Sequence, residues 1–383
     1  MVDAVRVAII GAGKWARDAH LPGLARSPLA DPVIICDLRE DLARERARQF
    51  DVPEITTDFE EVLAREDIDA VDICTRGDHS QLVFATLEAG KHCLVEKPVA
   101  SDYRDVWRAH AMARERGLKT RVGLTFRYAP AVMYMSQLIR EGFIGQPFIF
   151  NGFEQNSQWL DPDVPLDKRD HLQYPEGEDK IGDDPDPGAI AVSSLEGYGA
   201  PIIDIGLLSV GSQIREVCGR MRNFIPYRRR TNLDSDRERI NVDDGTLFLA
   251  EHENGTLCSI QTSYVTVGNY PGVEARIYGS RGALICRLVE DSEECQSLYA
   301  ATPEALDFRR LQIPDEYFPP GYVQGENWAS MFYANLVHDF MREILHGESH
   351  GGDFADSARV QEIINAVEMS SRQRSWVKLP LEQ

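Results

Sequence analysis

The sequence feature that most constrains this chain is a glycine-rich turn near its N-terminus. The apolar run Val5–Ile10 leads directly into Gly11-Ala12-Gly13-Lys14-Trp15-Ala16, and a helical pattern extends over Lys14–Arg26. In this GxGxxA arrangement the first glycine permits a tight turn and the second lets a pyrophosphate approach the backbone, while the alanine keeps the helix close to the strand. The helix N-terminus offers free N–H groups to phosphates. The turn therefore predicts a strand, a phosphate-binding loop and a helix.

An acidic residue further along supports a dinucleotide as the ligand. The next apolar run ends in Asp37, roughly 20 residues after Ala16, the spacing at which a carboxylate binds the ribose hydroxyls of an adenosine. Asp37 would repel a 2′-phosphate, so NAD is favoured over NADP. Arg39 weakens that preference, because its guanidinium could meet a phosphate. The alternative is an ordinary tight turn with a solvent-exposed aspartate.

Residues 1–124 alternate apolar runs of strand length with amphipathic helical patterns. The runs are Val5–Ile10, Pro32–Cys36, Ile68–Cys74, Lys91–Val95 and Lys119–Leu124. Strands with few polar breaks, separated by helices, form parallel sheets that are covered on both faces. We therefore expect an α/β fold whose N-terminal domain, residues 1–124, is a doubly wound Rossmann sheet.

The pattern changes after residue 125. Strand-like runs follow one another and are joined by turn sequences such as Glu253-Asn254-Gly255 and Ser280-Arg281-Gly282. Two amphipathic helices, Trp328–His346 and Phe354–Arg372, close the chain. We expect residues 125–383 to form an α+β domain with an open, largely antiparallel sheet that binds substrate and mediates assembly. The acidic segment Asp161–Pro187 reads either as a solvated loop or as a lid.

Composition excludes several classes of function. Acidic residues outnumber basic ones 62 to 41, and a net charge of −21 repels nucleic acid and anionic lipid. No stretch approaches the apolar length of a transmembrane helix. The seven cysteines include no CxxC pair, and no HExxH motif occurs, so we expect reduced thiols, no metal site and a cytoplasmic protein.

Two further strand ends carry candidate site residues, because the carboxyl ends of strands in a doubly wound sheet face the ligand. Thr75 and His79 follow one strand and could touch the cofactor, although His79 also reads as a partly exposed residue at a helix start. Glu96-Lys97-Pro98 follows the run Lys91–Val95. An ammonium there suits hydrogen bonding to a substrate hydroxyl beside a nicotinamide. The alternative is a structural Lys–Glu pair.

These motifs together resemble the Gfo/Idh/MocA family, the glucose–fructose oxidoreductase and inositol dehydrogenase group. The resemblance covers nearly the whole chain, and its most specific part is the Glu-Lys-Pro segment with the preceding Glu88-Ala89-Gly90-Lys91-His92. Other matching segments are Gly11-Ala12-Gly13, Phe126-Arg127-Tyr128, Gly142-Phe143-Ile144-Gly145, Glu253-Asn254-Gly255 and Tyr278-Gly279-Ser280-Arg281-Gly282-Ala283.

The resemblance implies an NAD(P)-dependent oxidoreductase that acts on a sugar, cyclitol or related polyol and assembles as a homodimer or homotetramer. It makes Lys97 the catalytic lysine. The Lys–Pro peptide of the family is often cis, which Pro98 permits. Arg127 matches a family arginine at the domain junction, although Thr125 stands where an Asn is common. The expected cofactor-binding residues are Gly11, Ala12, Gly13, Lys14, Trp15, Asp37, Arg39, Thr75, His79, Glu96, Lys97 and Arg127.

The sequence departs from the family where the proton-shuttling histidine is expected. Ungapped alignment of the D-x-x-x-H-x-x-D motif places Asp204 at the second aspartate and Pro201 at the histidine. A three-residue shift places Tyr198 there instead. Tyr198 is then either the acid/base or a packing and substrate-binding aromatic. Asp204 is either an orienting carboxylate or a helix-start charge, and Glu196 is a weaker candidate for proton transfer.

Three functions remain open at this point. The first is a dehydrogenase or ketosugar reductase that moves a hydride between NAD and a carbinol carbon. The second is an NAD-dependent glycosidase or lyase that oxidises its substrate transiently. The third is a non-catalytic NAD-binding regulatory protein, suggested by Pro201.

Overall fold

The computed structural model describes residues 4–164, 194–229, 236–269, 271–290 and 292–382. The chain divides into two compact units, each described here by itself. The N-terminal unit comprises Met1–Ala129 with Phe318–Arg359, and the second unit comprises Pro130–Tyr317 with Val360–Gln383. From residue 165 on, the acidic segment Asp161–Pro187 lies outside the described residues.

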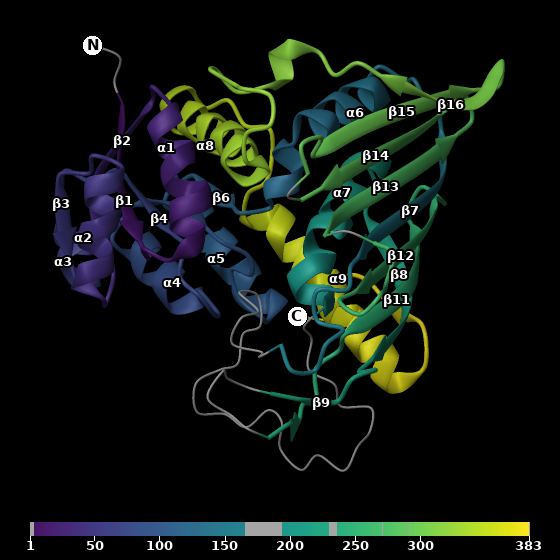
Figure 1. The fold of residues 1–383 in the computed structure, drawn as a ribbon, viewed down its shortest axis with the longest axis horizontal. Coiled ribbons are helices and arrows are strands. Elements are labelled where there is room, and N and C mark those ends of the chain that lie inside the picture. The colour runs from purple at the N-terminus through teal and green to yellow at the C-terminus, as the bar shows by residue number, and fades with distance from the viewer. Residues whose placement is uncertain (1–3, 165–193, 230–235, 270, 291, 383) are drawn as a thin grey trace. The chain divides into compact units, whose positions relative to one another are not determined.

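The N-terminal unit is built on a six-stranded parallel sheet with the order β3-β2-β1-β4-β5-β6 (Figure 1). This order is that of a doubly wound dinucleotide-binding fold, so the predicted fold class is confirmed. The strands are β1 (Val5–Ile10), β2 (Ala30–Cys36), β3 (Glu54–Thr56), β4 (Ala70–Ile73), β5 (His92–Val95) and β6 (Thr120–Val122). The short edge strand β3 carries too few apolar residues to be recognised from the sequence.

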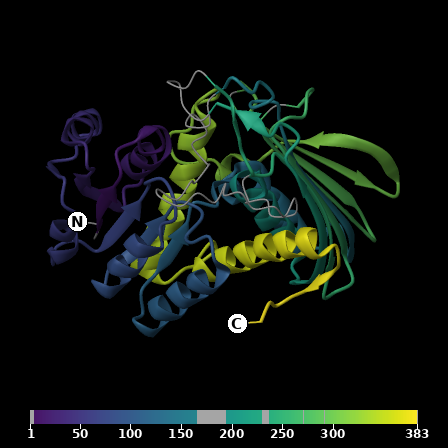
Figure 2. The same cartoon turned by 90° about the horizontal axis from the view of Figure 1, so that it is seen from below.

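Helices cover both faces of this sheet (Figures 1 and 2). They are η1 (Ala16–His20), α1 (Leu21–Arg26), α2 (Glu40–Gln49), α3 (Phe59–Ala64), α4 (Ser80–Glu88), α5 (Tyr103–Glu115), the short η2 (Thr125–Tyr128) and, from much later in the chain, α8 (Trp328–His346). Alternate residues of β1 divide between two cores. Val7 and Ile9 join one with Leu336 and Phe340 of α8, while Ile10 joins the other.

The membership of α8 differs from the predicted division of the chain at residue 124. A contiguous segment 125–383 would place α8 in the second unit, whereas its apolar face packs against α1 and β1 of the N-terminal unit. α8 packs there because one face of the parallel sheet needs apolar cover that the short helix α1 cannot supply alone.

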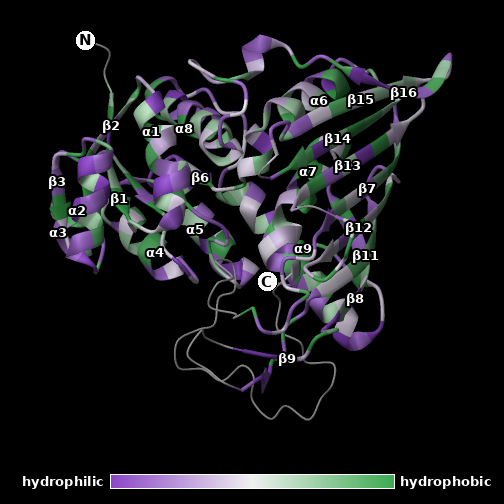
Figure 3. Ribbon diagram, in the orientation of Figure 1, coloured by the Kyte–Doolittle hydropathy of each residue, from purple (hydrophilic) through white to green (hydrophobic). Residues whose placement is uncertain are grey.

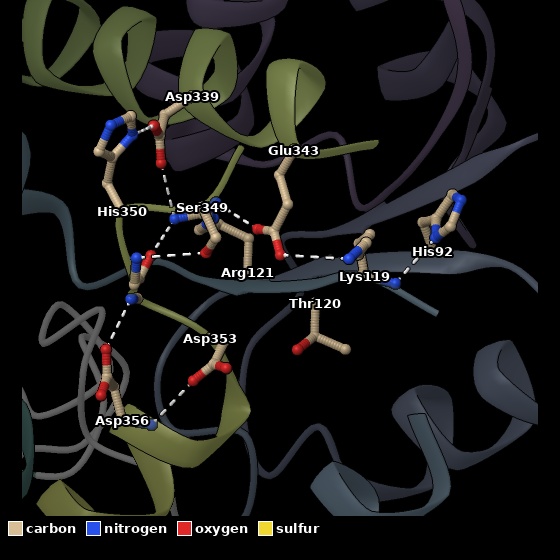
Figure 4. A network of polar contacts seen from close by, with 12 residues as sticks. His92, Lys119, Thr120, Arg121, Asp339, Glu343, Ser349, His350, Asp353 and Asp356 are labelled. Atoms are coloured by element: carbon tan, nitrogen blue, oxygen red, sulfur yellow. Dashed lines mark hydrogen bonds and ion pairs between the residues drawn. The ribbon is translucent and has the colours of Figure 1, made fainter. Parts of the chain in front are cut away.

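Buried ion pairs also hold α8 to the sheet edge (Figure 4). Arg121 of β6 is fully buried, and its Nη1 lies 2.8 Å from Asp339 of α8 while its Nη2 lies 2.6 Å from Glu343. The same guanidinium donates to the hydroxyl of Tyr128 at 2.6 Å and to the carbonyl of Gly351. The buried guanidinium has carboxylate partners only while α8 stays in place.

The second unit contains a nine-stranded mixed sheet with the order β16-β15-β14-β13-β7-β12-β11-β8-β17. All neighbours are antiparallel except β7 and β12, which confirms the predicted, largely antiparallel sheet. The strands are β7 (Pro147–Gln155), β8 (Ile214–Arg222), β11 (Gly245–His252), β12 (Leu257–Ser263), β13 (Gly272–Gly279), β14 (Ala283–Val289), β15 (Gln296–Thr302), β16 (Ala305–Leu311) and β17 (Val377–Lys378).

Helices pack on one face of the nine-stranded sheet. α7 (Ala200–Val210) contacts β7 and β13, and α6 (Pro130–Arg140) contacts β14 and β15. The remaining elements are η4 (Leu195–Gly199), the 3-10 turn η5 (Asp315–Tyr317), the C-terminal part of α9 (Phe354–Gln373), and the small sheet of β9 (Tyr227–Arg228) and β10 (Glu238–Arg239).

The opposite face of the nine-stranded sheet is open in the described chain. The strands of this sheet carry both hydrophobic and hydrophilic residues (Figure 3). Burial alternates along β11, so that Phe248 and Ala250 are buried while Leu247 and Leu249 are 53% and 55% exposed. Leu257 of β12 extends the same apolar patch, since it lies opposite Glu251 in the β11–β12 ladder. The sequence predicted an open sheet face at Val273–Gly279 and the neighbouring strands, whereas the exposed leucines lie on β11 and β12 of the same sheet.

No helix within the described ranges is long and apolar enough to cross a membrane. Over the same ranges no cluster of three or more His, Cys, Asp or Glu side chains is arranged to hold a metal ion. All seven cysteines are free thiols.

The Arg121 network gives a prediction about stability. Arg121→Met leaves Asp339 and Glu343 without their buried counter-charge. Breaking such a buried pair lowers the free energy of unfolding by about 3–5 kcal/mol. The matched control is Arg44→Met, which removes an exposed helical pair with Glu40 and should cost less than about 0.5 kcal/mol. Urea unfolding followed by circular dichroism measures both. If both variants lowered the free energy of unfolding equally little, the assigned role of the Arg121 ion pairs would be wrong.

Candidate active site

The glycine turn has the geometry that its sequence predicts. Gly11 has a φ of +104°, and a Cβ there would lie 2.9 Å from the carbonyl oxygen of Cys74, so only glycine fits. Its amide donates to the Cys36 carbonyl at 2.8 Å, which fixes the start of the turn against the end of β2. A Cβ on Gly13 would meet no atom within 4 Å, so that side of the loop is open to a ligand. Ala16 is buried where the helix meets the sheet.

Asp37 is bound to the loop and is not a solvent-exposed charge. Its carboxylate accepts from the amide of Ala12 at 2.8 Å and from the amide of Arg39 at 2.9 Å. The Arg39 Nε lies 3.9 Å from the same carboxylate, although its side chain is largely exposed. The two residues predicted to decide between NAD and NADP are therefore neighbours at the end of β2. Lys14, also predicted here, is exposed and pairs with Asp18 at 2.7 Å.

His79 joins the two loops that follow β4 and β5. Its ring is 1% exposed, with Nδ1 2.7 Å from the Pro98 carbonyl and Nε2 3.1 Å from the Thr75 carbonyl. The interpretation of His79 as a partly exposed helix-start residue is therefore wrong, because the N-terminus of α4 is covered by these loops. The Lys97–Pro98 peptide in the second loop is cis. His79 thus lies against the backbone that carries Lys97.

The carboxylate of Glu96 gathers contacts from several elements. Its Oε1 accepts from the indole of Trp15 at 2.9 Å and from the hydroxyl of Tyr333 in α8, and its Oε2 accepts from the amide of Lys97 at 3.2 Å. Only glycine fits at position 123, because a Cβ there would collide with this carboxylate. The side chain is 12% exposed. Glu96 therefore connects the phosphate loop to the start of the lysine segment.

Two residues that sequence reasoning missed complete this cluster. His20 and Asp72 are both fully buried, and the His20 Nδ1 lies 2.8 and 2.9 Å from the two oxygens of Asp72. The His20 Nε2 lies 3.4 Å from the Glu96 carboxylate. One signal could have found them. Asp72 is a lone acid inside the buried strand Ala70–Ile73, and a buried carboxylate requires a partner.

Opposing electrostatic effects set the charges in the cluster. Burial lowers the pKa of His20, but the charges of Asp72 and Glu96 and their hydrogen bonds outweigh it and raise that pKa to about 9. Burial raises the pKa of Glu96, but the contacts with His20, Lys97 and Tyr333 outweigh it and lower that pKa to about 2. Burial also raises the pKa of Asp72, against the pull of His20. These directions favour a cationic His20 beside an anionic Glu96 at neutral pH.

Arg127, the last predicted cofactor-binding residue, lies in η2. Its Nη1 is 2.9 Å from the carboxylate of Asp356, which also accepts from the amide of Gly352 at 2.7 Å. The guanidinium is mostly buried. The structure thus gives Arg127 an ion-pair partner in the N-terminal unit, and its predicted contact with the cofactor stays a prediction.

The candidate acid/base residues belong to the second unit. Tyr198 lies in η4, donates its hydroxyl to Gln158 at 2.8 Å, and packs edge-on against Tyr264 with ring centroids 4.9 Å apart. Asp204 lies within α7 and is 1% exposed. Glu196 accepts from Gln361 of α9 at 3.2 Å. The N-terminal unit carries every other predicted site residue, and it brings Gly11–Trp15, Asp37, Thr75, His79, Glu96 and Lys97 to the carboxyl edge of its sheet.

Comparison with known families agrees with this geometry. Residues 5–124 match a family model described as the oxidoreductase family with an NAD-binding Rossmann fold, and residues 194–285 match the GFO/IDH/MocA C-terminal domain. The chain belongs to the Gfo/Idh/MocA family. The resemblance stated from the motifs is thereby confirmed, as are the NAD-binding domain and the assignment as an oxidoreductase.

Several relatives of known name or structure are similar to the chain. Levoglucosan dehydrogenase from Pseudarthrobacter phenanthrenivorans is 26% identical over 98% of both chains. The scyllo-inositol 2-dehydrogenase (NAD+) of Bacillus subtilis is 31% identical over 41% of this chain and 46% of its own. Among solved structures, levoglucosan dehydrogenase in complex with NADH has a TM-score of 0.83 at 25% identity, covering 99% of this chain and 100% of that one. An oxidoreductase domain protein from Kribbella flavida has a TM-score of 0.84 at 27% identity, with the same coverage.

Proposed function

We propose that this protein is an NAD-dependent dehydrogenase or ketosugar reductase that transfers a hydride between the cofactor and a carbinol carbon of a sugar, cyclitol or glycoside. The observation that carries the proposal is the connection, through the Glu96 carboxylate, between the phosphate loop and Lys97. The names of the relatives support the substrate class, since levoglucosan is an anhydrosugar and scyllo-inositol a cyclitol.

The residues present fit a dinucleotide. The open side of Gly13 leaves room for a pyrophosphate against the backbone, and Asp37 lies at the end of β2 where an adenosine ribose would be held. Thr75 follows β4 at the same sheet edge and would line the cofactor site. Bound NAD supplies the hydride acceptor, or NADH the donor. Asp37 and the loop backbone bind and orient it.

Lys97 is proposed to hold the reacting hydroxyl. An ammonium donates hydrogen bonds only, so it stabilises the oxygen as its proton leaves and negative charge develops. Tyr198 is proposed to relay that proton, in place of the histidine of the family, because Pro201 has no titratable group. A neutral phenol accepts the proton only as it gives up its own, which passes to solvent. Asp204 is proposed to orient the substrate. The hydroxyl of Tyr198 donates a hydrogen bond to Gln158, and this contact fixes its orientation.

Replacement of the two proposed catalytic side chains tests this assignment. General acid–base groups contribute about 100- to 10,000-fold in rate, so Lys97→Ala should lower kcat at least roughly 100-fold. NAD binding should survive, because the phosphate loop is untouched. Tyr198→Phe keeps the packed ring and deletes the hydroxyl, and it should lose a comparable factor and change the shape of the pH–rate profile. NADH absorbance at 340 nm with a panel including levoglucosan and scyllo-inositol measures turnover.

The outcomes of this experiment separate the alternatives. If Tyr198→Phe keeps the wild-type kcat while Lys97→Ala loses it, the lysine acts alone or through water and the assignment of Tyr198 is wrong. If both variants turn over normally, the assignment of Lys97 is wrong. Bond cleavage without accumulation of NADH would indicate the glycosidase or lyase reaction instead.

The choice of cofactor is tested at Asp37. Its carboxylate should repel the 2′-phosphate of NADP, so the wild-type protein should bind NAD more tightly. Asp37→Ser removes the charge and should narrow or reverse the ratio of NAD to NADP affinity. Calorimetric titration of each cofactor measures this ratio. Tighter binding of NADP by the wild-type protein would show that Arg39 governs the preference.

We propose further that a second copy of the chain covers the open sheet face. The patch of Leu247, Leu249 and Leu257 is apolar. The neighbouring strand β8 carries a negative charge at Glu216 and a positive charge at Arg220. Two copies of this face can therefore pair apolar with apolar surface and opposite charges with each other. Exposed apolar sheet surface favours such association. The expected assembly is a homodimer or homotetramer.

Light scattering at micromolar concentration tests the assembly. The wild-type protein should have at least twice the mass of one chain, and Leu249→Glu should shift it toward the monomer by placing a charge in the patch. Val267→Glu is the matched control, because Val267 is exposed but follows β12 outside the sheet. A monomeric wild-type protein would contradict the proposal.

A further inference from the structure

A row of charged side chains crosses the N-terminal unit beneath the lysine segment. Asp72 comes from β4, His20 from the helix that follows the phosphate loop, and Glu96 from the end of β5. His20 lies between the two carboxylates, with Nδ1 at 2.8 and 2.9 Å from Asp72 and Nε2 at 3.4 Å from Glu96. Lys97 follows Glu96 directly and ends the row.

The surroundings of the imidazole leave it little freedom. The ring of Tyr333 lies 4.2 Å from the His20 ring, centroid to centroid, and the Tyr333 hydroxyl donates to Glu96. Trp15 donates to the same oxygen of Glu96. The titratable groups in contact with His20 are therefore Asp72, Glu96 and Tyr333, one from each of the elements packed around it.

Two carboxylates around one imidazole favour its protonated form. A neutral imidazole has one donor nitrogen, whereas an imidazolium has two and carries a positive charge. In the structure the His20 Nδ1 is hydrogen-bonded to Asp72, and the Nε2 faces Glu96 at 3.4 Å without a hydrogen bond, so its interaction with Glu96 is that of an ion pair. Two carboxylates facing a neutral ring in a buried site would be left partly unpaired, which is costly. With His20 protonated, the two anions Asp72 and Glu96 are balanced by the two cations His20 and Lys97. The raised pKa of His20, about 9, agrees with this count.

We propose that His20 is a positioning residue for Lys97, acting through Glu96. This inference rests on the proposed function of Lys97. The imidazole faces the Glu96 oxygen that Trp15 and Tyr333 bind, at 3.4 Å and without a hydrogen bond, while the other oxygen accepts from the backbone amide of Lys97. The charge of His20 therefore acts on the carboxylate that sets the direction in which the chain leaves β5 toward Lys97. Trp15 precedes η1 and His20 is its last residue, so the same carboxylate also contacts the helix that begins at the phosphate loop.

A double-mutant cycle tests this role in the holoenzyme. In His20→Asn the shorter amide can still donate to Asp72, but it is too short to reach Glu96 and carries no charge. The misplaced lysine should lower kcat roughly 10- to 100-fold, while the affinity for NAD changes less than about threefold since the loop contacts of Asp37 remain. In the Lys97→Ala background, His20→Asn should lower the residual kcat less than about twofold, since the group it positions is gone.

The matched control is His92→Asn. His92 is also a histidine of the N-terminal sheet, in the same strand that leads to Glu96, and its Nδ1 accepts from the Lys119 amide at 2.9 Å. It has no part in the charged row. His92→Asn should change thermal stability but leave kcat within about twofold of the wild-type value in both backgrounds.

A second measurement needs no substrate. In nitrogen NMR of the imidazoles, the His20 signal, assigned by its loss in His20→Asn, should show a doubly protonated ring from pH 6 to 8. Stability from this charge is fully present below pH 6.5 and is lost as the pH rises through about 9, because the pKa of the folded state is the higher one. The pH dependence of unfolding above pH 7 should be weaker in His20→Asn.

Each outcome decides between defined alternatives. A neutral His20 ring at pH 7, or an equal fall in kcat from His20→Asn in the wild-type and Lys97→Ala backgrounds, overturns the positioning role and leaves the proposed function standing. Wild-type turnover in Lys97→Ala contradicts the proposed function, and the positioning role with it. A fall in kcat confined to the background that retains Lys97, with a charged His20, supports the proposal.

Discussion

The N-terminal unit depends on one interaction, the set of hydrogen bonds to the carboxylate of Glu96. This group accepts from Trp15, from Tyr333 and from the amide of Lys97, and His20 lies beside it. A largely buried carboxylate is favourable only while its donors are present, because its lost hydration must be replaced. The phosphate loop, the end of β5 and α8 are thus held in one arrangement by a single charge.

The same requirement explains why α8 belongs with the sheet. Tyr333 supplies a donor to Glu96, and about two to three turns further on Asp339 and Glu343 form ion pairs with the buried Arg121 of β6. The helix covers apolar residues of β1 as well, so its removal would expose both a core and unpaired charges. A chain segment distant in sequence is therefore an integral part of the dinucleotide-binding unit.

Short-range patterns in the sequence predicted the features that depend on neighbouring residues in the chain. The turn at Gly11, the alternation of strands and helices, and the position of Lys97 after β5 follow from apolar periodicity and from the backbone needs of the glycine loop. The place of α8 and the partners of Asp72 did not follow, because they depend on contacts between segments far apart in the chain. His79 was misread for the same reason, since its burial comes from the loop of Pro98.

The cluster around Glu96 also depends on an irregular helix that no periodic pattern reveals. η1 is a π-helical turn, in which the amide of Leu21 donates to the carbonyl of Ala16, five residues earlier. In a regular α-helix, residues five apart point about 140° away from each other at 3.6 residues per turn. The wider turn brings Trp15 and His20 to the same carboxylate, 2.9 and 3.4 Å from its Oε1. π-turns occur often at functional sites, and here the turn lets one helix present two side chains to the group beside Lys97.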